Sequence, residues 1–231
     1  MRSFPSRKDH LFLRDGFETA GEFNFPLIKR QNVDLQNISL IPFHLTQPHD
    51  VKNKNCGVHF FLDDYRFECV YSKPEISQNR MLGYKFRLTP DFSEYREMDR
   101  WRLVENTGKS RWCGAYWQSK GEVVIPTISW AGLSTINICT SAIEKECVIA
   151  VCTVGCKMSK FDFLTCYNRA LEIVEPPKIL CVGEPFEKMD GDIICVAYSR
   201  SSKIITNKCL IANRDLCRND QLEIPFEEYA G

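Results

Sequence analysis

The stretch VIAVCTV, residues 148–154, decides the fold class. It is a near-continuous apolar run, without the in–out alternation of a strand that has one wet face. Such runs are typical of parallel strands that are covered on both faces. Six more short runs lie at 40–43, 58–62, 84–88, 123–130, 178–183 and 193–199, and most of them are near-continuous apolar stretches too. The sequence therefore predicts a mostly parallel sheet of about seven strands.

Helical patterns lie between these runs and predict crossover helices. The expected helices span 64–81, 96–120, 134–143 and 160–174. Pro74 is expected to end or kink the first helix, and Gly108 is expected to break the second into two pieces. This alternation favours an α/β fold with right-handed crossovers. We expect a (β/α)-barrel-like architecture, either a barrel or an incomplete barrel, with an open doubly wound sheet as the alternative.

The chain of 231 residues is long enough for one large core. We expect a loop-rich lead-in over 1–38, an α/β core over 39–199 and a C-terminal appendage over 200–231. No apolar run reaches the length of a signal peptide or a membrane span, which favours a cytoplasmic protein without membrane contact. Lys plus Arg, 30, balances Asp plus Glu, 30, which argues against a polycationic coat for nucleic acid.

Twelve cysteines are present, and none forms a CxxC pair. Zinc sites normally need such short paired spacings. Many of the cysteines fall inside apolar runs, where a thiol behaves as a small hydrophobic group. We therefore expect free buried thiols in a reducing compartment, with a redox or metal role as the alternative.

Small and acidic polar residues gather where the predicted strands end. In a parallel sheet these ends face one edge, where ligands bind. Asp63 and Asp91 are the candidate catalytic acid and base. The candidate substrate-binding residues are Asp64, Ser93, Arg111, Tyr116, Gln118, Ser129, Trp130, Thr153 and Glu184. Of these, Ser129, Thr153 and Glu184 are expected to converge with the two catalytic carboxylates.

Structural roles compete with these functional ones. Asp64 is a candidate N-cap of the helix that follows it. Asp91 and Glu94 have the three-residue spacing of a capping box, which would make both of them helix caps. Trp130 is a candidate core residue, since large aromatic side chains are usually buried.

Convergent carboxylates can also hold a divalent cation. If a metal is bound, Mg²⁺ or Mn²⁺ is expected at Asp63, Asp91 and Glu184. Neither GxGxxG after the first strand nor GxxxxGK[ST] occurs, so the NAD-binding and P-loop nucleotide motifs are missing. The four histidines lie in the first quarter of the chain and offer no partner for a serine, which disfavours a hydrolase triad.

The block 111–121, RWCGAYWQSKG, packs three large aromatic residues and two cations together. It could form a stacking surface for a ligand, but a crossover helix that buries Trp112 and Trp117 is the favoured interpretation. Arg111 remains a candidate contact for an anionic group. Five basic residues in the appendage could touch the phosphates of a nucleic acid or form a solvated tail: Arg200, Lys203, Lys208, Arg214 and Arg218.

Four segments carry a resemblance to a known family: VHFFLDDYRFECVY, LTPDFSEY, SRWCGAYWQSKGEVVIPTISW and VIAVCTVGC. Together they resemble the domain-of-unknown-function family 4417, over roughly residues 25–185. Members of that family are typically found in bacteria, phages and other mobile elements. The resemblance implies a bacterial or phage intracellular protein, and it implies no mechanism. Its blocks coincide with the strand-end positions chosen above.

These features favour a small enzyme that hydrolyses or transfers a group on a phosphate-containing or glycosidic small molecule. The alternative is a non-catalytic module of a phage or mobile element that sequesters a host protein, a nucleotide or DNA.

Overall fold

Each of the seven apolar runs contains a strand in the computed structural model, which describes residues 9–198 and 205–206. The strands are β3 (Ser39–Pro42), β4 (Cys56–His59), β5 (Phe86–Leu88), β6 (Val124–Ile125), β7 (Ile149–Cys152), β8 (Ile179–Val182) and β9 (Ile193–Val196). Every pairing among these strands is parallel. The predicted α/β fold with mostly parallel pairing is confirmed.

The predicted single sheet of about seven strands is wrong. β3 to β6 form one parallel sheet, and β10 (Ile205–Thr206) pairs antiparallel with the outer edge of β3. β7 to β9 form a second parallel sheet, and one parallel bridge, Thr127 to Ala150, links the two sheets beyond the end of β6. Within the described ranges no pairing joins β9 to β3, so a closed barrel is not seen.

Pro126 explains why the two sheets meet at only one bridge. The Ala150 N–H donates to the Pro126 carbonyl, and the Ile128 N–H donates to the Ala150 carbonyl, each at 2.9 Å. The next bridge toward the start of β6 would need an N–H at position 126, and proline has none. The ladder between β6 and β7 therefore cannot extend toward the start of β6.

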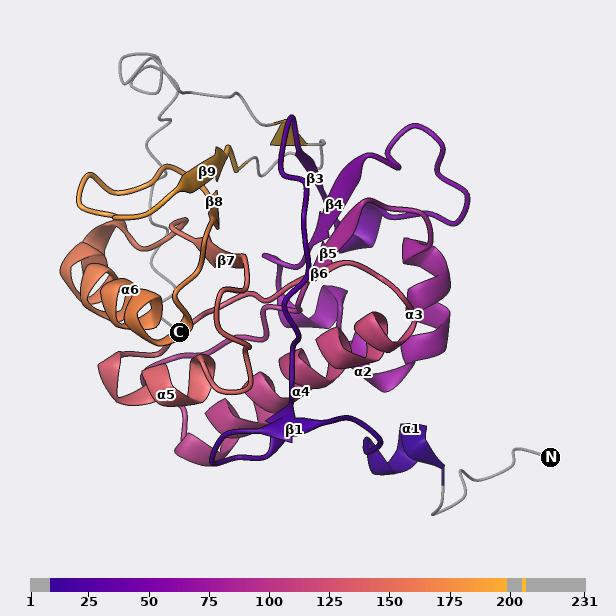
Figure 1. Cartoon of the computed structure of the whole chain (residues 1–231), viewed down its shortest axis with the longest axis horizontal. Helices are drawn as coiled ribbons and strands as arrows, with labels where there is room; N and C mark the ends of the chain where they lie inside the picture. Colours follow the sequence, from indigo (N-terminus) through magenta and orange to yellow (C-terminus); the bar gives the residue numbers. More distant parts are fainter. Residues whose placement is uncertain (1–8, 199–204, 207–231) are drawn as a thin grey trace, which may run out of the picture.

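Helices cover the outer faces of the two sheets. The larger set is α2 (Cys69–Ser72), α3 (Pro74–Met81), α4 (Arg100–Ser119), α5 (Ile136–Cys139) and α6 (Lys160–Val174), and the short α1 (His10–Leu13) lies away from the sheets near the start of the described chain. The 3₁₀ turns η2 (Asp64–Arg66), η3 (Leu133–Thr135) and η4 (Lys157–Ser159) each precede a helix, and η1 (Phe43–Leu45) follows β3. Figure 1 shows α2 and α3 beside the first sheet and α6 beside the second.

Of the two predicted helix breaks, the structure has the one at Pro74 but not the one at Gly108. Pro74 is the first residue of α3, and Lys73 before it is non-helical, so the expected break at the proline is confirmed. The expected break at Gly108 is wrong, because α4 runs through it without interruption. One interior glycine costs a helix only about 1 kcal/mol. Leu103 and Trp112, buried on either side of Gly108, anchor the helix against the core.

Side chains from both sheets share one interior cluster. It includes Leu40, Leu88, Ile125, Ala150, Leu180 and Val196. The opposite face of the first sheet packs on α4 through residues such as Val58 and Trp117. The opposite face of the second sheet packs on α6 through Val151 and Tyr167. Alternate residues of each strand therefore point to the shared interior and to the covering helices.

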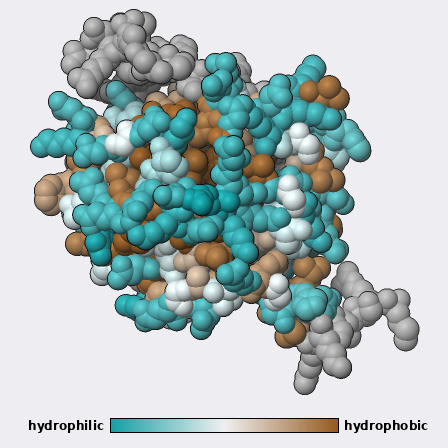
Figure 2. Space-filling view, in the orientation of Figure 1, coloured by the Kyte–Doolittle hydropathy of each residue, from teal (hydrophilic) through white to brown (hydrophobic). Residues whose placement is uncertain are grey.

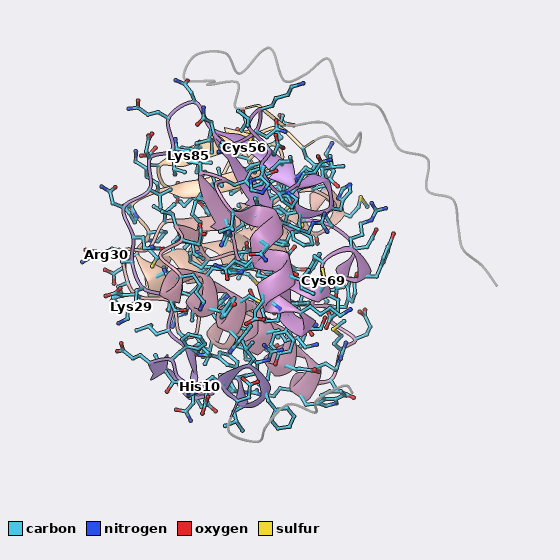
Figure 3. The ribbon with its side chains drawn as sticks, turned by 90° about the vertical axis from the view of Figure 1, so that its right-hand side faces the viewer. His10, Lys29, Arg30, Cys56, Cys69 and Lys85 are labelled. Atoms are coloured by element: carbon cyan, nitrogen blue, oxygen red, sulfur yellow. The ribbon has the colours of Figure 1, made fainter. Side chains whose placement is uncertain are left out.

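An N-terminal hairpin, β1 (Thr19–Ala20) with β2 (Phe25–Pro26), leads into a segment that runs along the flank of the molecule that carries Lys29 and Arg30 (Figure 3). Ile28 in this segment is fully buried. On the face drawn in Figure 2, hydrophilic side chains predominate and hydrophobic ones show in the gaps between them.

Six of the ten cysteines in the described ranges are buried. This agrees with the expectation that cysteine serves as a small hydrophobic residue here. None of the described helices combines the length and the apolar composition that crossing a bilayer requires.

Two glycines of α4 give a matched test of this packing. A Cβ at Gly114 would lie 2.5 Å from Ile28 Cδ1 and 2.8 Å from Thr89 Cγ2, whereas one at Gly108 would approach only the Phe25 ring, at 3.2 Å. We expect Gly114→Ala to lower the free energy of unfolding by about 1–3 kcal/mol through overpacking. Gly108→Ala should leave it unchanged or raise it by up to about 1 kcal/mol. Urea denaturation followed by circular dichroism measures both, and equal losses would contradict this account.

Candidate functional site

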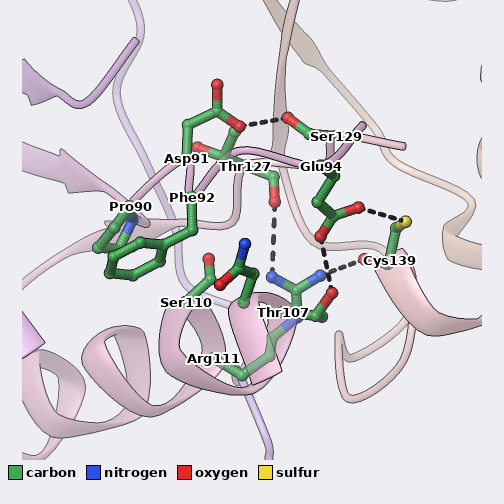
Figure 4. Close-up of a pocket in the computed structure, with 11 residues that line it drawn as sticks. Pro90, Asp91, Phe92, Glu94, Thr107, Ser110, Arg111, Thr127, Ser129 and Cys139 are labelled. Carbon is green, nitrogen blue, oxygen red and sulfur yellow. Dashed lines mark hydrogen bonds between the residues drawn. The ribbon is translucent and has the colours of Figure 1, made fainter. Parts of the chain in front are cut away.

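A small polar cavity lies where β5 and β6 end, above α4 and beside α5 (Figure 4). Its volume of about 10 Å³ is room for about one water molecule. It is lined by Pro90, Asp91, Phe92, Glu94, Asn106, Thr107, Ser110, Arg111, Thr127, Ser129 and Cys139. We call this set the acid pocket. It sits at the carboxyl edge of parallel strands, where ligand sites of α/β folds are built.

Two threonine side chains hold the strand ends together around the acid pocket. The Thr127 N–H donates to Thr89 Oγ1 at 2.8 Å, and Thr127 Oγ1 donates to the Thr89 carbonyl at 2.9 Å. Ser110 of α4 adds a hydroxyl contact to Thr89 Oγ1 at 3.1 Å. Side-chain bonds thus replace the regular main-chain ladder at this point, and the strand ends separate into two loops lined by polar groups.

Asp91 lies on the loop after β5, and the Ser129 hydroxyl of the loop after β6 donates to its Oδ1 (Figure 4). Burial, helped by the negative charge of Asp64, raises the pKa of Asp91 to about 6, and the hydrogen bond from Ser129 acts in the opposite direction. At neutral pH this carboxyl is mostly ionised, and a moderate change in its surroundings would protonate it.

Glu94 comes from the same loop as Asp91 and faces α4 and α5. Thr107 Oγ1 donates to Glu94 Oε1 at 2.8 Å, and the Cys139 thiol donates to Oε2 at 3.2 Å. Burial raises the pKa of Glu94 to about 7, although the two hydrogen bonds and the charge of Arg111 act in the opposite direction. Glu94 can therefore gain or lose a proton near neutral pH.

Arg111 lies beneath the two carboxyls with only 1% of its surface exposed. Its Nε donates to the Ser141 carbonyl at 3.0 Å, Nη1 to the Thr127 carbonyl at 3.5 Å, and Nη2 to the Cys139 carbonyl. Burial lowers its pKa to about 10, so the guanidinium stays charged. The structure places Arg111 as a clamp that ties the end of α5 to the loop after β6.

Asp64 and Ser93 form a second link between strand ends. The Ser93 hydroxyl donates to Asp64 Oδ1 at 2.9 Å, and the Ser93 N–H donates to the same carboxylate at 3.2 Å. Asp64 opens the turn η2 but does not cap it; the N-cap position belongs to Asp63, whose side chain makes no capping bond. The structure therefore brings Asp64 and Ser93 together on neighbouring loops.

Asp63 is not brought to Asp91. Its side chain is 69% exposed and pairs with Arg66 at 3.4 Å. Glu184 lies exposed after β8, and Thr153 lies buried at the end of β7, where its N–H donates to the Val182 carbonyl. None of the three lines the acid pocket.

The remaining candidates serve packing or chain attachment. Trp130 packs on Phe163, with ring centres 5.0 Å apart. Tyr116 stacks on Trp112 in the core against the first sheet. Gln118 accepts from the Lys29 N–H at 2.9 Å and donates to the Lys29 carbonyl at 2.7 Å, which fastens the N-terminal segment to the end of α4.

Sequence reasoning missed Glu94, Thr107 and Cys139 as members of the pocket. The capping-box assignment of Asp91 and Glu94 is wrong, because α4 begins at Arg100 with Asp99 at its N-cap position. The sequence feature that could have identified Glu94 as a pocket residue is the presence of two carboxyls, Asp91 and Glu94, on one strand-end loop. Cys139 had no sequence signal.

The structure supports neither the predicted metal site nor the predicted nucleic-acid contacts directly. In the part of the chain that the structure describes, no three His, Cys, Asp or Glu side chains come together as metal ligands. A role for Mg²⁺ or Mn²⁺ stays a prediction. The basic residues from Arg200 to Arg218 lie outside the described residues.

The sequence model of one family, described as a domain of unknown function (DUF4417), matches residues 17–199. The chain belongs to this family. Its relatives include the Gene 1 protein of Mycobacterium phage L5, which is 35% identical over 184 residues, covering 78% of this chain and 80% of the relative. The Gene 1 protein of Mycobacterium phage D29 is 35% identical over 188 residues, covering 78% of this chain and 67% of that relative. No solved structure matches the chain.

The raised pKa of Asp91 predicts a dependence of stability on pH. The folded state holds this proton more tightly than the unfolded chain, so stability falls as the pH rises from below 4 through about 6. Asp91→Asn removes that loss and keeps an acceptor for Ser129. When the pH rises from 5 to 8, the free energy of unfolding of the wild type should therefore fall by about 1 kcal/mol more than that of the variant. Urea denaturation at both pH values measures this, with Asp63→Asn as the control that should follow the wild type.

Proposed function

We propose that the acid pocket is the acid–base centre of a hydrolase or transferase that acts on a phosphate-containing or glycosidic small molecule. The observation that supports this most is the pair of carboxyls in one pocket with pKa values raised to about 6 and about 7. Two carboxyls that share a pocket and have pKa values raised toward neutral pH can divide acid and base roles between them.

In this proposal Asp91 is the base and Glu94 the acid. Asp91, held by the Ser129 hydroxyl, accepts the proton of an attacking water or hydroxyl group. Glu94 donates its proton to the departing oxygen, and Thr107 holds its other carboxyl oxygen. The cavity has room for about one water molecule, which suits the attacking group, while the rest of the substrate binds at the mouth.

We further propose that the two sheets are parts of an incomplete (β/α) barrel. The strands β3 to β9 follow each other in chain order, the bridge from Thr127 to Ala150 links the sheets, and one interior cluster collects side chains from both. In such folds the carboxyl edge carries the catalytic groups. The similarity to phage proteins favours action in the cytoplasm of a bacterial host.

The test measures hydrolysis of p-nitrophenyl phosphate and of a set of p-nitrophenyl glycosides between pH 5 and pH 8. We expect Asp91→Asn and Glu94→Gln each to lower kcat by about 10²–10⁴, since each removes one proton-transfer group. The rate of the wild-type protein should be greatest between pH 6 and pH 7, where Asp91 is ionised and Glu94 is protonated.

Asp63→Asn is the matched control, because Asp63 precedes Asp64 in the same turn and is exposed. It should keep the wild-type rate. A wild-type level of turnover in Asp91→Asn, or an equal loss in Asp63→Asn, would contradict the assignment. If the wild-type protein turns over none of these compounds, the sequestering module becomes the better account.

A further inference from the structure

A second, much wider cavity opens between the turn after β6 and the first turns of α6. Its volume is about 550 Å³, which is in the range of small-molecule sites. It is lined by Arg96, Ala131, Gly132, Leu133, Ser134, Phe161, Asp162, Thr165 and Cys166. We call it the wide cavity.

Two large apolar side chains on the wide cavity are unusually exposed. Phe161 is 82% exposed, and Leu133 on the opposite segment is 53% exposed. An aromatic ring in this position offers a face on which a planar group can stack. A ligand that covered both side chains would remove apolar surface from water, which is favourable.

The same cavity carries a donor and an acceptor side by side. The Arg96 guanidinium pairs with the Asp162 carboxylate, and both side chains are more than half exposed. Such exposed pairs contribute little to stability, so a ligand can exchange with either partner at small cost. Ser134 and Thr165 add hydroxyl groups to the lining. An aromatic face flanked by one cation, one carboxylate and hydroxyls suits a planar ring with donors and acceptors along its edge.

The wide cavity and the acid pocket are built on the same two loops. The loop after β5 carries Glu94 to one and Arg96 to the other. The loop after β6 carries Ser129 to one and Ala131 to the other. The Cys139 thiol, which contacts Glu94, also donates to the Thr135 carbonyl at 3.1 Å, in the turn that borders the wide cavity. The two cavities are therefore positioned by the same two strand-end loops.

We infer that the wide cavity binds the base of a nucleoside or nucleotide, stacked on Phe161 with its polar edge toward Arg96 and Asp162. A nucleotide contains both a phosphate ester and a glycosidic bond, the two bond types of the proposed function. The inference names the substrate class of that function and rests on it for the reaction, whereas binding of the base needs only the wide cavity.

The test uses AMP, GMP, CMP and UMP as probes, with affinity measured by isothermal titration calorimetry. We expect at least one of them to bind the wild-type chain. Phe161→Ala should weaken that binding about 5- to 150-fold, the usual effect of losing one base-stacking ring. Met158→Ala is the matched control, because Met158 is 97% exposed, lies three residues away and does not line the cavity. Asp162→Asn should change the order of preference among the four bases.

Asp91→Asn separates the two proposals. It should bind the nucleotide as the wild type does, while release of phosphate or free base, followed by chromatography, is lost. Binding that is retained with no product formed by the wild type would uphold the inference and overturn the proposed function. If none of the four nucleotides binds, or if Phe161→Ala binds as tightly as Met158→Ala, the inference is overturned whatever Asp91 does.

Discussion

The interrupted main-chain hydrogen bonding around Pro126 is the constraint on which the rest of the site depends. Because Pro126 has no N–H, β6 cannot continue a ladder with β7, and the two sheets touch at one bridge. On the other side of β6, the hydroxyls of Thr89 and Thr127 take over from the main chain. The strand ends are held in place and yet separate, and the gap that results is lined by polar groups.

Glu94 can take up a proton because Arg111 bonds to main-chain carbonyls and not to this carboxylate. A guanidinium bonded directly to Glu94 would lower the pKa of that carboxyl, as a close opposite charge does. Arg111 instead gives its N–H groups to three main-chain carbonyls. Its charge moderates the pKa of Glu94 from a distance, and burial remains the larger effect, so the carboxyl can exchange a proton near neutral pH.

The sequence predicted the strands well because most of them are buried apolar runs, and burial on both faces leaves a strong pattern. It predicted a single sheet because Pro126 lies inside such a run, and the pattern does not reveal which strand edge the proline faces. For the site, the rule that parallel strands end at one edge led to Asp91 and Ser129, which do meet. The same rule could not choose between Asp63 and Asp64, because the turn that starts there sends adjacent side chains in different directions.

Glu94 was misassigned because its spacing from Asp91 fits a helix cap, and spacing alone does not say where the helix starts. Contacts between residues far apart in the chain could not be predicted from the sequence. The Cys139 thiol meets Glu94 across 45 residues, and it also bonds to the Thr135 carbonyl at the border of the wide cavity.

This thiol gives the two cavities a physical connection. In the proposed function, a ligand that moved the 131–135 turn would change the hydrogen bonding of Glu94, and by thermodynamic linkage the protonation of Glu94 would change the affinity for that ligand. Proton transfer and ligand recognition would then be coupled by the same pair of loops.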